Sequence, residues 1–455
     1  MKAIMTGDPF VVLSAMLAIL AFCCVFAGCF YQLGGIRALL LDPRLYVLLA
    51  VFVGVVFKLG WLAVFELPPL AMDSYFSSDK AVVKATIYIG CSIGIFFLAF
   101  GIMPNVQIRQ PVLSAQLIPS LRLVYIFMFF ISVTAFYVMW ESLGWSTLWS
   151  NVSAKRFNDM DGGASRMQSS VYWLYQLSGL LKYPLYLFAA YVFSSARRVR
   201  FFDYALIFVG IGFLVLQSIT LSQRAHLLML IVDMFLIYLL FSSAAQVRVS
   251  WRKVIPVAIS VVFLFMYVTV SRSDHAAEKT FAEHFVYSKY FLDLGKTAMI
   301  IEYSDSVGKG DSCALFGWVF LFTPSIGVEF KECFLQLGKF VGSEVYGLEV
   351  SGVPPGFLGE MYLYFGFLGG VFGALALALF MWSCKVIMLT EGFIFRVIYA
   401  ILITRFLFLL FNNGVGQFLL RIFFEGMLVS LFFMVVCFFK QIISLKRSVK
   451  AGVDE

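Results

Sequence analysis

Long stretches of the chain carry apolar side chains at nearly every position and are separated by short polar segments. A helix needs about 20 apolar residues to cross the hydrocarbon core of a bilayer. Eleven runs reach or approach this length, at residues 10–31, 45–65, 81–103, 121–140, 171–193, 201–221, 225–242, 254–270, 357–382, 393–411 and 418–439. The pattern predicts an all-α polytopic integral membrane protein with about eleven transmembrane helices. Only residues 222–224 separate the sixth and seventh runs, so one interrupted helix is the alternative there.

Alternate loops between these runs lie on the same side of the membrane, and one of the two sets holds most of the basic residues. Clusters lie at 197–200, 252–253 and 440–450, whereas the loops of the other set hold scattered lysines such as Lys80 and Lys84. Cytoplasmic loops of membrane proteins carry the excess of Lys and Arg, because these residues resist translocation. The asymmetry therefore places the C-terminus in the cytoplasm and, with eleven spans, the N-terminus outside.

Composition agrees with a membrane protein. The 455 residues are 62% hydrophobic and 13% charged, whereas soluble chains carry about 25% charged residues. This difference excludes a soluble enzyme and a disordered chain. The net charge of +8 follows from the loop asymmetry, and no basic face or motif indicates a nucleic-acid partner.

Residues 271–359 form one long polar segment between the eighth and ninth apolar runs, on the external side. Through residue 360 it holds seven Lys and Arg against twelve Asp and Glu. From residue 281 to 301 its apolar residues recur at helical spacing, which predicts amphipathic helices lying over the membrane face. The chain is thereby divided into residues 1–270 with helices 1–8 and a short external loop near 141–170, the large loop 271–359, and residues 360–455 with helices 9–11 and a cytoplasmic tail.

Four arginines at or near the external membrane boundary are candidate ligands for a diphosphate. A charge at membrane depth is costly and is a functional-site hypothesis by default. Arginine binds phosphate through two parallel hydrogen bonds and stays charged at any working pH. The four are Arg156, Arg224, Arg272 and Arg421. Snorkelling of each side chain to lipid phosphates is the alternative.

Glu360 is a candidate catalytic residue at the start of the ninth run. It follows Pro354-Pro-Gly-Phe-Leu-Gly, a segment that ends the long loop. A helix N-terminus favours an ionised glutamate, so a purely capping role is the alternative to a catalytic one.

Short motifs in this order resemble the Wzy-type polymerases of O-antigen and enterobacterial common antigen. The similarity covers most of the chain, loosely outside the motifs. The motifs are Arg156-Phe-Asn, Ser222-Gln-Arg-Ala-His226, Ser271-Arg272 before the large loop, Phe322-Thr-Pro-Ser325 and Pro354-Pro-Gly-Phe-Leu-Gly-Glu-Met-Tyr362. The arginine-rich periplasmic loop of that family is represented here by Arg156 and Arg166 alone.

This resemblance implies a GT-C-like, inverting glycosyltransferase in the bacterial inner membrane, with the large loop in the periplasm. Such an enzyme joins undecaprenyl-diphosphate-linked oligosaccharide repeat units and releases undecaprenyl diphosphate without a metal or other cofactor. Fixed arginines would stabilise the negative charge that develops on the leaving diphosphate. The implied partners are the lipid-linked oligosaccharide, membrane lipids and a chain-length regulator of the Wzz type.

The acceptor hydroxyl in such a reaction needs a general base. The candidates are Glu360, which the motif favours, and His275 and His284, whose unperturbed pKa lies near neutrality. An O-antigen ligase that transfers polymer to the lipid A core is the alternative enzyme. A lipid-linked oligosaccharide flippase or other transporter is the alternative of a different class.

Two further features concern cysteines and metals. Cys313 and Cys333 share the large loop, where the oxidising periplasm allows a disulfide, and two free thiols are the alternative. Asp159 and Asp161 stand two residues apart, but such a pair is common by chance, so we interpret it as a solvated loop and expect no metal.

Overall fold

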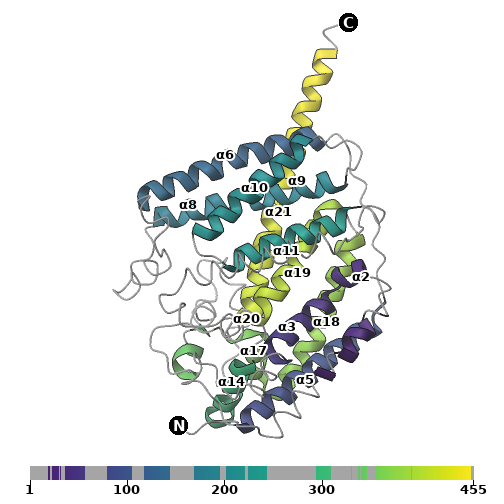
Figure 1. Cartoon of the computed structure of the whole chain (residues 1–455), viewed down its shortest axis with the longest axis vertical. Helices are drawn as coiled ribbons and strands as arrows, with labels where there is room; N and C mark the ends of the chain where they lie inside the picture. Colours follow the sequence, from purple (N-terminus) through teal and green to yellow (C-terminus); the bar gives the residue numbers. More distant parts are fainter. Residues whose placement is uncertain are drawn as a thin grey trace. The chain divides into compact units, whose positions relative to one another are not determined.

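The computed structural model describes residues 19–20, 23–29, 31, 36–56, 79–104, 117–143, 169–194, 201–220, 224–242, 294–308, 329, 337–338, 340–345, 354–390 and 392–451. Within these residues every regular element is a helix (Figure 1). Five of the helices are long and apolar enough to cross a membrane: Lys80–Ile102, Ile118–Ser142, Phe201–Thr220, Phe367–Thr390 and Val415–Ile442. The predicted class of α-helical membrane protein is confirmed, while the total of eleven spans and the GT-C-like arrangement stay predictions.

The chain forms two compact units that interleave along the sequence. The first contains residues 1–107, 282–387 and 402–424, and the second contains residues 108–281, 388–401 and 425–455. The three segments expected from the sequence, residues 1–270, 271–359 and 360–455, are defined by the side of the membrane on which their loops lie. This division stays a prediction.

The first unit is built from helices at both ends of the sequence. They are α2 (Ile36–Leu40), α3 (Pro43–Val51), the π-helix η1 (Phe52–Val56), α5 (Asp79–Ile102), α14 (Leu294–Val307), the π-helix η6 (Val341–Val345), α17 (Gly356–Phe365), α18 (Phe367–Thr390), the π-helix η7 (Phe406–Leu410), α20 (Phe411–Asn413) and the start of α21 (Val415–Ala451). Helix α14 packs against both α5 and α17, and α17 packs against α20. These contacts bring the end of the large loop beside the start of α21.

The second unit contains α6 (Ile118–Leu143), α8 (Ser169–Gly179), α9 (Lys182–Ser194), α10 (Phe201–Thr220), α11 (Arg224–Phe241), most of α19 (Phe393–Arg405) and the remainder of α21. Aromatic rings join these helices: Tyr125 stacks on Phe188 with centroids 5.2 Å apart, and Phe213 contacts both Phe129 and Phe136 edge-on. Helices α10 and α11 pack against each other. Residues 221–223 lie outside the described residues, so the choice between two helices and one interrupted helix there stays a prediction.

Two apolar runs that the sequence presents as continuous are divided in the structure. The run at 171–193 becomes α8 and α9, because Pro184 lacks a backbone N–H and its ring clashes with the carbonyl four residues earlier. The run at 357–382 becomes α17 and α18, which meet at Gly366, where φ is 63°. Only glycine adopts this conformation at little cost. The ten residues of α17, which carry Glu360, therefore lie outside the five helices of spanning length.

Candidate functional site

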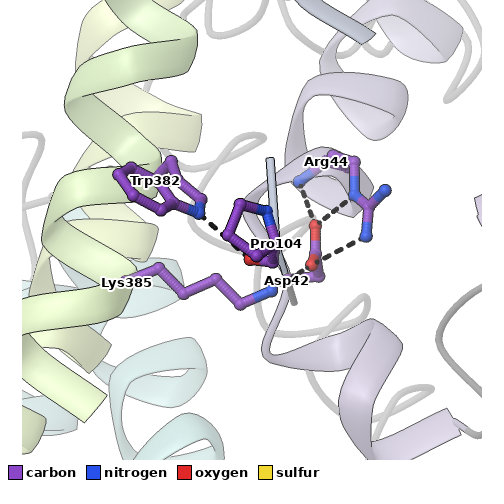
Figure 2. Close-up of polar contacts among 5 residues, drawn as sticks. All are labelled: Asp42, Arg44, Pro104, Trp382 and Lys385. Atoms are coloured by element: carbon purple, nitrogen blue, oxygen red, sulfur yellow. Dashed lines mark hydrogen bonds and ion pairs between the residues drawn. The ribbon is translucent and has the colours of Figure 1, made fainter. Parts of the chain in front are cut away.

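A buried ionic cluster in the first unit, which we call the Asp42 cluster, consists of Asp42, Arg44 and Lys385 (Figure 2). Asp42 is the N-cap of α3 and is fully buried, and Pro43 occupies the first position of the helix. Its Oδ1 accepts hydrogen bonds from the backbone N–H and Nε of Arg44, at 3.0 and 2.8 Å. Its Oδ2 accepts from Arg44 Nη2 at 3.2 Å and from Lys385 Nζ at 2.6 Å.

The Asp42 cluster joins the N-terminal part of the chain to α18. Both cations also lie over the ring of Phe100, at 5.3 Å for Arg44 and 5.8 Å for Lys385. Close by, Trp382 Nε1 donates to the carbonyl of Pro104 at 3.1 Å (Figure 2). All four acceptor positions of the carboxylate are occupied by donors, so the cluster is arranged to hold helices together and has no oxygen left for a ligand.

A second polar cluster, the Glu360 cluster, lies where α14, α17 and the α20–α21 junction meet. It consists of Lys296, Glu360, Asn412, Asn413 and Gly414. Glu360 is 2% exposed, and its Oε2 accepts the backbone N–H of Val415, the first residue of α21, at 2.7 Å. Glu360 therefore caps the N-terminus of α21, whereas the alternative considered from the sequence was a cap of its own helix.

Gly414 makes this approach sterically possible. Its φ is 102°, and a Cβ atom at this position would collide with Oε2 of Glu360. Among the described residues, no donor is bonded to the other carboxylate oxygen, Oε1. One oxygen is therefore held by the backbone, and the second is left to accept a proton.

Lys296 brings a positive charge into the same cluster. It lies in the first turn of α14, is 3% exposed, and donates through Nζ to Oδ1 of Asn412 at 3.1 Å and to the carbonyl of Pro354 at 3.4 Å. Asn412 in turn donates to Oδ1 of Asn413 at 2.8 Å. The ammonium group thus ties the residues preceding α17 to those preceding α21.

Helix α17 is positioned by contacts with α5 and α14. Tyr362 donates to Oδ1 of Asp305 at 3.2 Å, and Asp305 forms an ion pair with Lys84 at 2.6 Å. The hydroxyl of Tyr88 donates to the carbonyl of Leu358 at 3.1 Å. Because Tyr362 and Leu358 each lie two residues from Glu360, these bonds fix the part of α17 that presents the carboxyl group.

Burial is the dominant influence on the acidity of Glu360. Removal from water disfavours the ionised form and raises the pKa of Glu360 from 4.5 to about 7, although the hydrogen bond from Val415 opposes the rise. A carboxyl group with a pKa near neutrality can both accept and release a proton under physiological conditions.

The other predicted site residues are distributed as follows. Arg421 lies on α21 in the first unit, on the same helix whose N-terminus Glu360 caps, and its side chain is half-buried. Arg224 begins α11 in the second unit, and its side chain is not among those described. A final group lies outside the described residues: Arg156, Arg272, His275, His284, Cys313 and Cys333.

Lys296 is the functional candidate that sequence reasoning missed. The helical spacing of residues 281–301 indicated an amphipathic helix, on which a lysine is ordinarily a solvated residue. Leu294 and Ala298 share one helix face and Lys296 lies about opposite to it, so the local pattern carried no signal that Lys296 is buried. Within the described residues, no group of three or more His, Cys, Asp and Glu side chains is arranged to hold a metal.

Comparison with protein-family models, curated proteins and solved structures found no match to this chain.

Proposed function

We propose that the protein is a membrane-embedded glycosyltransferase that polymerises undecaprenyl-diphosphate-linked oligosaccharide repeat units. The observation that carries the proposal is the placement of Glu360, within the Gly-Glu-Met-Tyr motif, against the Asn412-Asn-Gly segment that precedes Arg421. The motif that carries Glu360 and the segment that leads to Arg421 thus meet around one buried carboxyl group.

In the proposed reaction Glu360 is the general base. Its Oε1 takes the proton of the acceptor hydroxyl, while that hydroxyl oxygen forms a bond to the anomeric carbon of the donor glycan. The bond between this carbon and the phosphate oxygen breaks, and undecaprenyl diphosphate leaves with the electron pair. The Val415 N–H holds Oε2 in place during the transfer, and the pKa of about 7 suits a base at neutral pH.

Transport is a second candidate function, and one observation favours it. Helix α17 ends at Gly366 before α18 begins, and α19 continues into the π-helix η7. Interrupted helices of this kind are typical of transporters, in which the freed backbone groups bind the substrate or ion. The O-antigen ligase reaction uses the same carboxyl and leaving-group chemistry, with the lipid A core as acceptor.

A single reconstitution separates these functions. The full-length protein, purified in detergent, is incubated with lipid-linked repeat units extracted from cells that lack this chain, with and without lipid A core. A polymerase gives a ladder of chain lengths on the carrier, a ligase gives one transfer to lipid A core, and a transporter leaves every covalent bond unchanged. Absence of a ladder from a folded, homogeneous preparation overturns the polymerase proposal.

A further inference from the structure

Arg396 is a buried cation that the proposed function does not use. It lies in the first turns of α19, in the second unit, and its side chain is 2% exposed. Among the residues that the structure describes, none bonds its Nε or Nη1 atoms, both of which are buried. Burying a guanidinium N–H without a hydrogen-bond partner is costly, so the Nε and Nη1 atoms of Arg396 indicate a ligand from outside the described residues.

An aromatic cluster lies around Phe393, one helical turn before Arg396. Phe393, at the start of the same helix, contacts Phe241 at the end of α11 with ring centroids 5.1 Å apart. It also contacts Phe433 of α21, with centroids 6.2 Å apart. The rings carry no charge that could pair with the guanidinium. They lower the local polarity, and this strengthens the attraction between the guanidinium and an anion.

The helix geometry adds donors to the same place. Side chains of helical residues lean toward the N-terminus of their helix, so the guanidinium of Arg396 extends over the first turn of α19. The first N–H groups of a helix have no partner within it, and together with the helix dipole they attract anions. Gly392, directly before the helix, is exposed and would have no atom within 4 Å of a Cβ, so the approach to this turn is open.

Arg122 in the same unit provides the contrast. Its Nε and Nη2 atoms bind the two oxygens of Asp203, each at 2.6 Å. The Nε/Nη2 fork of Arg122 is therefore already filled by a carboxylate. For Arg396, no residue in the described part of the chain bonds Nε, which is one arm of the same fork.

We propose that Arg396 and the first turn of α19 form a binding site for a phosphate group. The guanidinium fork matches two oxygens of one phosphate, and the N–H groups of the helix reach a third. A membrane phospholipid supplies this group together with acyl chains that fit the aromatic cluster around Phe393, and free phosphate is the other source of the same chemistry.

The test uses the full-length protein in dodecyl maltoside, a detergent without phosphate. The probes are dioleoyl-phosphatidylglycerol, dioleoylglycerol, which has the same acyl chains and no phosphate, and inorganic phosphate. We expect phosphatidylglycerol to raise the Tm of the wild type and to be retained in native mass spectra, with dioleoylglycerol giving neither effect. A rise with inorganic phosphate as well identifies free phosphate as a source and supports the site.

Arg396→Gln should weaken phosphatidylglycerol binding by about tenfold or more, since a charge-assisted pair of hydrogen bonds is lost. Arg396→Lys keeps the charge but loses the planar fork, so its affinity for phosphatidylglycerol should lie between those of the wild type and Arg396→Gln. This variant preserves the test if Arg396→Gln does not fold. Arg122→Lys is the matched control and should bind as the wild type does. Wild-type binding by Arg396→Gln, equal stabilisation by dioleoylglycerol, or a glutamine variant more stable than the wild type in every probe overturns the proposal.

Discussion

The Asp42 and Glu360 clusters each bury a carboxyl group in the first unit, but they use it differently. Asp42 receives four hydrogen bonds, two on each oxygen, from two cations and one backbone N–H. From the described residues Glu360 receives one, on Oε2, and Lys296 of the same cluster is bonded to Asn412 and Pro354. A carboxylate whose acceptor positions are all occupied by donors holds helices together, whereas one with an unoccupied acceptor position can still exchange a proton. Under the proposed function, the Asp42 cluster holds helices together and the Glu360 cluster supplies the base.

The largest expected effect is on catalysis. Glu360→Gln keeps an oxygen that can accept the Val415 N–H, but it removes the base, so the rate of polymer formation should fall by about 10²- to 10⁴-fold. Ladder formation from lipid-linked repeat units measures the rate, and thermal unfolding confirms the fold. Glu302→Gln, on an exposed residue of the neighbouring α14, is the control and should polymerise normally. Full-length polymer from the Glu360 variant would falsify the base assignment.

The next largest effect is on stability. Asp42→Asn removes the carboxylate charge that Arg44 and Lys385 bind and should cost about 3–5 kcal/mol of unfolding free energy. Denaturant unfolding in dodecyl maltoside measures it. Adding Lys385→Met removes one of the two cations and should recover part of the loss, because the pair is directly coupled. A double variant no more stable than the single one contradicts the role given to the cluster.

A pH series distinguishes the two clusters further. The pKa of Glu360 is raised to about 7 from 4.5, so its protonated form stabilises the fold fully below pH 4.5 and this stabilisation is lost as the pH rises to about 7. The stability of the wild type relative to Glu360→Gln should therefore fall across that window. Activity should move in the opposite direction, rising by about tenfold per pH unit below 7. A flat stability difference would show that Glu360 titrates as an exposed carboxyl does.

A smaller effect is expected at Gly414. Alanine there adopts an unfavourable φ and collides with Oε2 of Glu360, which should destabilise the protein by about 1–3 kcal/mol and reduce polymer formation by displacing the carboxyl group. Gly212→Ala, on α10 with no atom within 4 Å of the added Cβ, is the control and should leave both properties unchanged. Normal activity of Gly414→Ala at normal stability would separate Gly414 from the site.

The smallest effect concerns the ion pair of Lys84 with Asp305. Both side chains are well exposed, at 38% and 49%, and exposed pairs contribute about 0–1 kcal/mol. Asp305→Asn should therefore change the unfolding free energy by less than about 1 kcal/mol, measured alongside Asp42→Asn. A loss as large as that of Asp42→Asn would place Asp305 among the buried structural charges.

Those parts of the fold that depend on one local pattern of residues could be predicted from the sequence. Continuous apolar runs predicted the five spanning helices, because helix length and lipid contact depend on neighbouring residues alone. Pro184 and Gly366 lie within such runs, and hydropathy alone did not reveal the breaks they cause, although both residues are known helix interrupters.

Contacts between residues that are far apart in the chain could not be predicted from the sequence. Glu360 was predicted from its motif, yet the helix that it caps begins 55 residues later, and no local rule connects the two. Lys296 was missed because its environment depends on Asn412, which is 116 residues away. The same limit applies to Arg396: its charge is visible in the sequence, but only the structure shows that no described residue bonds its Nε and Nη1 atoms.

The Asp42 cluster also sets an order of events during synthesis. Asp42 and Arg44 are two residues apart and can pair as soon as they leave the ribosome, whereas Lys385 follows 343 residues after Asp42. The ionic contact of the N-terminal segment therefore stays incomplete until Lys385 has been synthesised. Docking of this segment onto α18 is a late step of assembly, and a truncated chain that stops before Lys385 would lack the partner that completes it.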